Sequence, residues 1–211
     1  MVFYMDGPYE RLRFGDILKD FLTISITIND PVPELQKAKA KFEISADHYV
    51  LMSPCCSIED NIIMLCPLIP IKPVYLKNPY FADDMTRINK KVPPEKRLPP
   101  DKWEKLSEEN RQSMENKGPD FANVEVFIFP YHPSLPANDL EYKKQPYPDM
   151  PYMIDFRRIF SVKCDKIDRE QKKIPVEAKV LELTPNARKC LRDKISFFFY
   201  RTAEEDLPFL E

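Results

Sequence analysis

The sequence predicts a single α+β domain in which a β-rich core is interrupted by a helical insertion and followed by a C-terminal helix. Three observations support this fold class. Residues 21–28 alternate Leu and Ile with Thr and Ser, which is the period of a half-buried strand. Short apolar runs ended by prolines follow, and the clearest helical spacing lies near the C-terminus. We divide the 211 residues into a core (1–71 and 122–180), an insertion (72–121) and a terminal helix (181–203).

The N-terminal part of the core is expected to supply several strands. A Gly15-Asp16 turn precedes the alternating segment, and residues 35–44 fit either a strand or a short helix. Apolar runs at 48–52 and 61–65 are typical of buried strands. Because the linker between these two runs is short, we expect them to form an antiparallel pair.

The insertion is polar and punctuated by prolines, and two helices fit between them, at 82–90 and 101–116. Pro99 and Pro100 precede the second helix and Gly118 follows it, which are typical start and stop residues. Its apolar positions are sparse, so we expect it to lie on the surface of the domain.

The rest of the chain alternates between strands and a strap. We predict strands at 124–129 and 152–162, separated at 130–151 by an extended segment with six prolines and three tyrosines. The terminal helix is predicted at 185–200, with a Thr N-cap and a Pro at its first position. Its apolar face consists of Ala187, Leu191, Ile195 and Phe198.

Composition excludes several classes of function. Lys and Arg total 32 and Asp and Glu total 34, so the net charge of -2 excludes a strongly basic nucleic-acid binder. The glycines Gly7, Gly15 and Gly118 are far apart, which excludes P-loop and dinucleotide fingerprints. No signal peptide and no membrane-spanning apolar run is visible. Five cysteines without framework spacing indicate reduced thiols, and we expect a cytoplasmic protein.

The cysteines are candidates for metal ligands and for a nucleophile. Cys55 and Cys56 are adjacent and Cys66 follows ten residues later, whereas zinc sites favour pairs separated by two to four residues. We expect no metal and no cofactor. His48 could approach Cys55 or Cys56 across the hairpin, but no Cys-His protease signature surrounds them.

A family resemblance rests on three stretches: Gly15 to Leu18, Tyr49 to Pro54, and Ile63 to Pro67. Together they resemble the PemK/MazF-like toxins of bacterial toxin–antitoxin systems. The resemblance implies a core folded as a small SH3-like β-barrel. The later part, with residues 152–157 and the ending Phe-Phe-Tyr-Arg201, looks like uncharacterised bacterial proteins.

The resemblance also implies an RNA-cleaving activity to be tested against the residues. Enzymes of this family use an Arg just before the second strand and a Thr just after the next. Here Asp47 and Ile69 stand at the resembling positions, and a carboxylate at the Arg position would repel the scissile phosphate. His48 is the one candidate general base beside them.

Two surface features remain as candidate binding sites. Lys90, Lys91, Lys96 and Arg97 lie near aromatic residues that could stack on bases, although we favour the interpretation that they belong to a solvated face with ion pairs. The strap and the first residue after it offer Tyr131, Tyr142, Tyr147 and Tyr152 for docking a partner, or else the strap covers an edge strand of its own core.

From these observations we expect a non-enzymatic, intracellular bacterial module for protein interaction or regulation, in a toxin–antitoxin or antiviral defence system by the resemblance. The expected partner is another protein, with weak nucleic-acid binding at most and no membrane. Two alternatives stay open: a divergent or degenerate MazF-like endoribonuclease, and an RNA-binding module.

Overall fold

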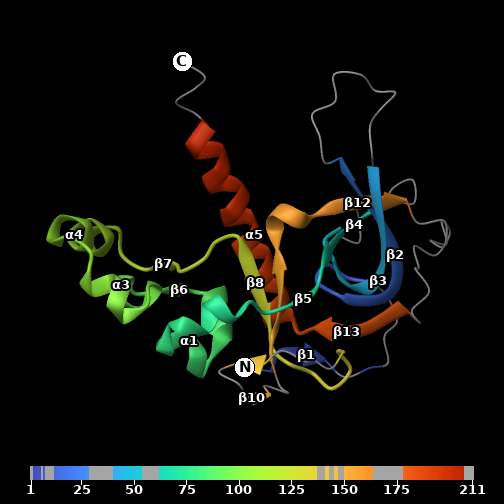
Figure 1. Cartoon of the computed structure of the whole chain (residues 1–211), viewed down its shortest axis with the longest axis horizontal. Helices are drawn as coiled ribbons and strands as arrows, with labels where there is room; N and C mark the ends of the chain where they lie inside the picture. The colour runs from blue at the N-terminus through green and yellow to red at the C-terminus, as the bar shows by residue number, and fades with distance from the viewer. Residues whose placement is uncertain are drawn as a thin grey trace.

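The computed structural model describes most of the chain and shows a mixed α+β fold with antiparallel sheets (Figure 1). This confirms the predicted class. The described residues are 2–5, 7, 12–28, 40–53, 62–136, 141–142, 145–146, 150–163 and 178–206.

The largest sheet has six strands in the order β1-β13-β2-β3-β4-β12. The alternating segment lies in β2, which pairs with β3 from Ile17 opposite Val50 to Ile28 opposite Ala40. The predicted pair at 48–52 and 61–65 is β3 and β4, and it is antiparallel as expected. The bounds are β1 (Tyr4–Met5), β2 (Ile17–Ile28), β3 (Ala40–Leu51), β4 (Ile62–Pro67), β12 (Phe160–Lys163) and β13 (Lys179–Leu183).

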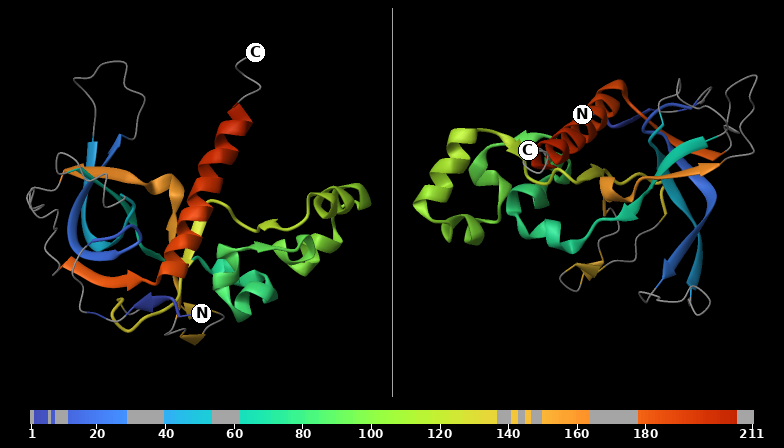
Figure 2. Two further views of the ribbon diagram at one scale, coloured as in Figure 1. Left: turned by 180° about the vertical axis from the view of Figure 1, so that it is seen from behind. Right: turned by 90° about the horizontal axis from the view of Figure 1, so that it is seen from above.

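This sheet curves strongly but remains open (Figure 2). Among the described strands, β1 and β12 each pair with one neighbour, so the closed SH3-like barrel that we expected is not found. One reason is that the predicted strand 152–162 is not continuous. The Asp155 carboxylate accepts a hydrogen bond from the Arg157 backbone N–H, which begins a 3₁₀ turn, η5 (Phe156–Arg158). The turn separates β12 from β11 (Tyr152–Asp155), which belongs to another sheet.

That second sheet has the order β5-β11-β8, and its strands β8 and β11 are buried on both faces. Its other strands are β5 (Ile69–Pro70) and β8 (Val126–Phe129). Because side chains alternate along a strand, Phe127 and Phe129 pack toward the main core, whereas Ile128 and Met153 pack toward the insertion. The sheet thus lies between two hydrophobic cores.

The insertion is more broken than the sequence predicted. The helix expected at 82–90 is two short elements, α1 (Pro79–Asp83) and η4 (Met85–Asn89), divided at Asp84. The helix expected at 101–116 is also divided, because Ser107 caps a new helix there. Gly118 ends that helix with φ 71°, as predicted. The remaining elements are η3 (Pro73–Lys77), β6 (Lys91–Val92), α2 (Pro94–Arg97), α3 (Pro100–Glu104), α4 (Glu108–Lys117) and β7 (Asp120–Phe121).

The terminal helix is confirmed as α5 (Pro185–Asp206). Its N-cap is Thr184, whose hydroxyl accepts a hydrogen bond from the Ala187 N–H. Ala187 and Leu191 are buried in the main core. The last turns of α5 extend beyond the body of the protein (Figures 1 and 2). In the strap, β9 (Glu141–Tyr142) pairs with β10 (Gln145–Pro146).

Candidate functional site

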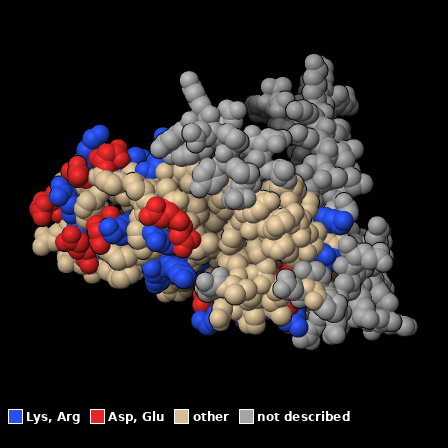
Figure 3. Space-filling view, turned by 90° about the horizontal axis from the view of Figure 1, so that it is seen from below, with Lys and Arg blue, Asp and Glu red and all other residues tan. Residues whose placement is uncertain are grey.

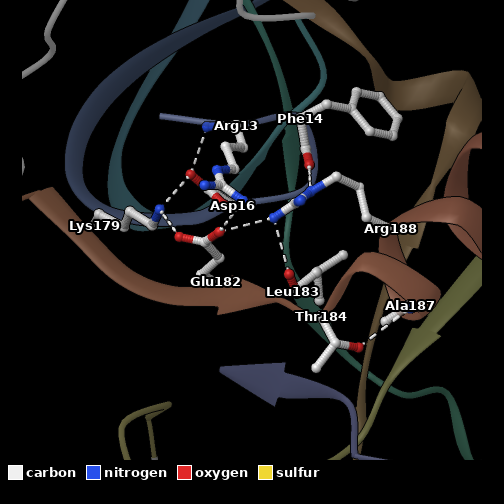
Figure 4. A network of polar contacts seen from close by, with 9 residues as sticks. All are labelled: Arg13, Phe14, Asp16, Lys179, Glu182, Leu183, Thr184, Ala187 and Arg188. Atoms are coloured by element: carbon white, nitrogen blue, oxygen red, sulfur yellow. Dashed lines mark hydrogen bonds and ion pairs between the residues drawn. The ribbon is translucent and has the colours of Figure 1, made fainter. Parts of the chain in front are cut away.

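A buried charge cluster lies where β2, β13 and α5 meet (Figure 4). It consists of Arg13, Asp16, Lys179, Glu182 and Arg188. The ammonium of Lys179 is 2.8 Å from Asp16 Oδ2 and 2.5 Å from Glu182 Oε2. The Glu182 carboxylate also contacts Arg13 at 3.1 Å and Arg188 at 3.0 Å.

The charged side chains of this cluster connect separate segments of the fold. Burial raises the pKa of Asp16 to about 6, although Lys179 opposes that shift. Burial also acts to raise the pKa of Glu182, but the neighbouring cations outweigh it and lower the pKa. Arg188 in addition donates hydrogen bonds to the Phe14 and Leu183 carbonyls. The cluster therefore joins three segments, and neither of the two cavities described next includes its residues.

A cavity of about 300 Å³, here called the junction cavity, opens where the N-terminal segment, η4, the end of β8 and the first turns of α5 meet. Phe3, Pro130 and Ala187 give it apolar walls. Its lining residues are Phe3, Asp84, Thr86, Asn89, Lys90, Pro130, Ala187 and Cys190.

The polar groups of the junction cavity differ in how far they are already satisfied. Both polar atoms of the Asn89 side chain are engaged, because its amide donates to the Ile128 carbonyl and its oxygen accepts from the Ile128 N–H, both at 2.7 Å. Asp84 Oδ1 accepts two hydrogen bonds from Thr86. The Lys90 ammonium makes no ion pair with any residue in the described part of the chain.

A smaller cavity of about 100 Å³ lies inside the insertion. Its walls include Tyr75, Arg97 and Asn123. Arg97 contacts the Asp120 carboxylate at 3.4 Å, and Asn123 donates to the Tyr75 hydroxyl at 3.3 Å. Burial raises the pKa of Tyr75. These polar groups contact one another, and the space beside them is small for a ligand.

The four basic residues singled out in the sequence do not form one surface. Lys90 lies at the junction cavity, whereas the Lys91 ammonium is 5.0 Å from the centre of the Phe197 ring. Lys96 lies over the Tyr80 ring, and Arg97 pairs with an aspartate. Figure 3 shows Lys and Arg interleaved with Asp and Glu over the insertion, seen from below. This arrangement is typical of a solvated face rather than a track for a phosphate backbone.

The strap tyrosines occupy different environments. Tyr131 is half-buried, and Tyr152 is buried in the main core with its hydroxyl donating to the Pro136 carbonyl. The ring of Tyr152 is therefore not offered to a partner. The backbone of Tyr142 lies in β9, and Tyr147 lies outside the described residues. Tyr4 anchors the start of the strap by donating to the Pro130 carbonyl at 2.7 Å.

The residues weighed for catalysis are only partly brought together. Asp47 and His48 lie in β3 and Ile69 in β5, and the Leu68 N–H donates to the His48 carbonyl. Burial raises the pKa of the Cys66 thiol to about 12, which keeps it protonated at neutral pH. Cys55 and Cys56 lie outside the described residues. Within the described part, no three His, Cys, Asp or Glu side chains gather as metal ligands would.

The last turns of α5 carry a feature that the sequence interpretation missed. Phe197 packs against Phe121 and Phe198 against Phe156, with ring centres 5.1 and 5.6 Å apart. The next two side chains, Phe199 and Tyr200, are 56% and 63% exposed. Four consecutive aromatic residues in a helix cannot all face one core, and this signal was present in the sequence.

A buried lysine connects α5 to the insertion. The Lys194 side chain has no exposed surface, and its ammonium donates to the Ile88 carbonyl and lies 5.2 Å from the centre of the Phe121 ring. Burial holds the pKa of Lys194 well below its usual value. This contact fixes the orientation of α5 relative to the insertion.

Comparison with protein-family models, curated proteins and solved structures finds no match to this chain. In the described residues, no helix has the length and apolar character needed to cross a membrane.

Proposed function

We propose that the chain is a non-enzymatic protein-interaction module that docks a partner on the last turns of α5. The observation that carries this proposal is the exposure of Phe199 and Tyr200, at 56% and 63%, on a helix end that extends from the body. Large aromatic side chains supply much of the binding energy in protein interfaces, and Tyr is among the residues enriched at their centres.

Rigid presentation of this aromatic pair supports the proposal. The contacts of Phe197 with Phe121 and of Phe198 with Phe156 hold the preceding turn in place. Lys194 fixes the same helix one turn earlier. A partner would therefore meet a helix that is already ordered, which lowers the entropy cost of binding.

The biological setting is proposed from the family resemblance alone. On that basis the curved β2–β4 region is a divergent, open relative of the SH3-like barrel, and the partner belongs to a toxin–antitoxin or antiviral defence system of the bacterial cytoplasm. The departures at Asp47 and Ile69 support binding over RNA cleavage, because neither side chain supplies the cation or donor that a phosphate transition state needs.

The proposal is tested by quantitative partner capture from cells of the source organism. We expect the double variant Phe199→Ser/Tyr200→Ser to capture at least about tenfold less of a partner that the unaltered chain retains. The matched control is Val74→Ser, because Val74 is 55% exposed but lies on the insertion. Equal capture by the double variant and the control would contradict the proposal. Circular dichroism establishes that both variants are folded.

A further inference from the structure

The junction cavity combines an apolar wall with charges of opposite sign. Phe3, Pro130 and Ala187 line it together with Asp84 and Lys90. Its volume of about 300 Å³ lies at the small end of the range for ligand sites. A site of this composition favours a short ligand with an apolar body and charged groups.

The two charges lie at opposite ends of one short element. Asp84 is the N-cap of η4 and Lys90 is its C-cap. A 3₁₀-helix rises about 2.0 Å per residue, so the six steps along the chain from Asp84 to Lys90 separate their Cα atoms by about 12 Å. An extended peptide advances about 3.3–3.6 Å per residue. The separation therefore corresponds to about three residues of extended chain.

Both charged side chains can still form a hydrogen bond or ion pair with a ligand. Asp84 Oδ1 is used by Thr86, but Oδ2 has its nearest cation, Arg87 Nε, at 4.0 Å. The Lys90 ammonium carries three N–H donors and forms no ion pair among the described residues. The cavity thus offers an acceptor at one end and a cationic donor at the other.

We propose that the junction cavity binds the C-terminal end of a peptide. Its free carboxylate pairs with Lys90, its last apolar side chain lies against Phe3 and Pro130, and a basic side chain three residues earlier pairs with Asp84. A chain end suits a cavity of this size, because an internal segment would have to both enter and leave it. The inference rests on the proposed function in that the ligand is part of a protein, but it uses a different surface from the end of α5.

The test is fluorescence anisotropy with synthetic hexapeptides ending in Lys-Gly-Gly-Leu. We expect the free acid to bind at least about tenfold more tightly than the C-terminal amide, because a charge-assisted contact is lost. Lys90→Ala should weaken the free acid to the level of the amide and leave the amide unchanged. Lys91→Ala is the matched control and should change neither, since that neighbouring ammonium lies over Phe197.

The other end of the cavity is tested with a peptide in which Gln replaces the Lys. The unaltered chain should bind the Lys peptide more tightly than the Gln peptide, and Asp84→Asn should abolish this difference. Cys190 supplies an independent report of location, because it lines the cavity and is half-buried. The free-acid peptide should slow alkylation of Cys190, measured by peptide mass spectrometry.

The proposal is overturned if no peptide binds at millimolar concentration, if acid and amide bind equally, or if Lys91→Ala acts like Lys90→Ala. The double variant Phe199→Ser/Tyr200→Ser should bind the free-acid peptide normally. Loss of partner capture with intact peptide binding therefore counts against the proposed docking at α5 alone. Intact partner capture without peptide binding counts against the cavity alone.

Discussion

Replacement of Asn89 by Ala is predicted to destabilise the protein strongly. The Asn89 side chain pairs with both the N–H and the carbonyl of Ile128, at 2.7 Å each, in a buried position. The substitution leaves both backbone groups without partners. Each unpaired buried group costs about 1–3 kcal/mol, so the two together predict about 2–6 kcal/mol. Because Asn89 also lines the junction cavity, water can enter and hold the loss near about 2–4 kcal/mol.

Urea denaturation measures this loss. With a slope of about 2 kcal/mol per molar urea, the midpoint should fall by about 1–2 M. Asn110→Ala is the control, because Asn110 is exposed on α4 and its substitution should change the free energy of unfolding by less than about 0.5 kcal/mol. Hydrogen exchange should also show faster exchange of the Ile128 amide. A loss for Asn89→Ala no larger than that of the control would refute the reasoning.

Three further predictions concern the buried Lys194, the turn at Gly15 and the residues weighed for catalysis. Burial lowers the pKa of Lys194 in the folded chain. Between that lowered pKa and the usual pKa of lysine, this side chain is protonated only in the unfolded chain. The free energy of unfolding should therefore rise with pH over that range, by up to about 1.4 kcal/mol per pH unit. Lys194→Met should remove that slope in urea titrations and Lys189→Met should not. Gly15→Ala should cost about 1–3 kcal/mol, since φ is +89° and the added Cβ would lie 2.7 Å from a leucine side chain; Gly118→Ala, with open space around it, should cost less in the same assay. Purified protein should release no discrete fragments from total RNA by primer extension, and fragments that disappear in His48→Ala would show a working ribonuclease.

The elements that the sequence predicted well are those whose signals are local. The start of α5 was readable because Thr184 and Pro185 act within one turn. The break at Asp155 was not, because apolar residues continue on both sides of it and the change of sheet is a tertiary event. Strand β13 was missed for a related reason. Lys179 and Glu182 resemble surface residues in sequence, and only the cluster that pairs them explains their burial.

The candidate site depended even more on tertiary structure. Lys90 and Lys91 are neighbours in sequence, yet one lines the junction cavity and the other lies over an aromatic ring. No local pattern shows that Phe3, Pro130 and Cys190 meet. These residues come from three segments that are far apart in the chain, so their proximity becomes visible only in the folded structure.

The sheet formed by β5, β11 and β8 has a consequence for how the molecule unfolds. One face of β8 and β11 belongs to the main core and the other to the core of the insertion. The hydrophobic core of the insertion is therefore completed by residues of β8 and β11, and separating the insertion from this sheet would expose Ile128 and Met153 to water. Unfolding should be a single cooperative transition rather than two. A fragment of residues 72–121 expressed alone would lack the surface on which it folds.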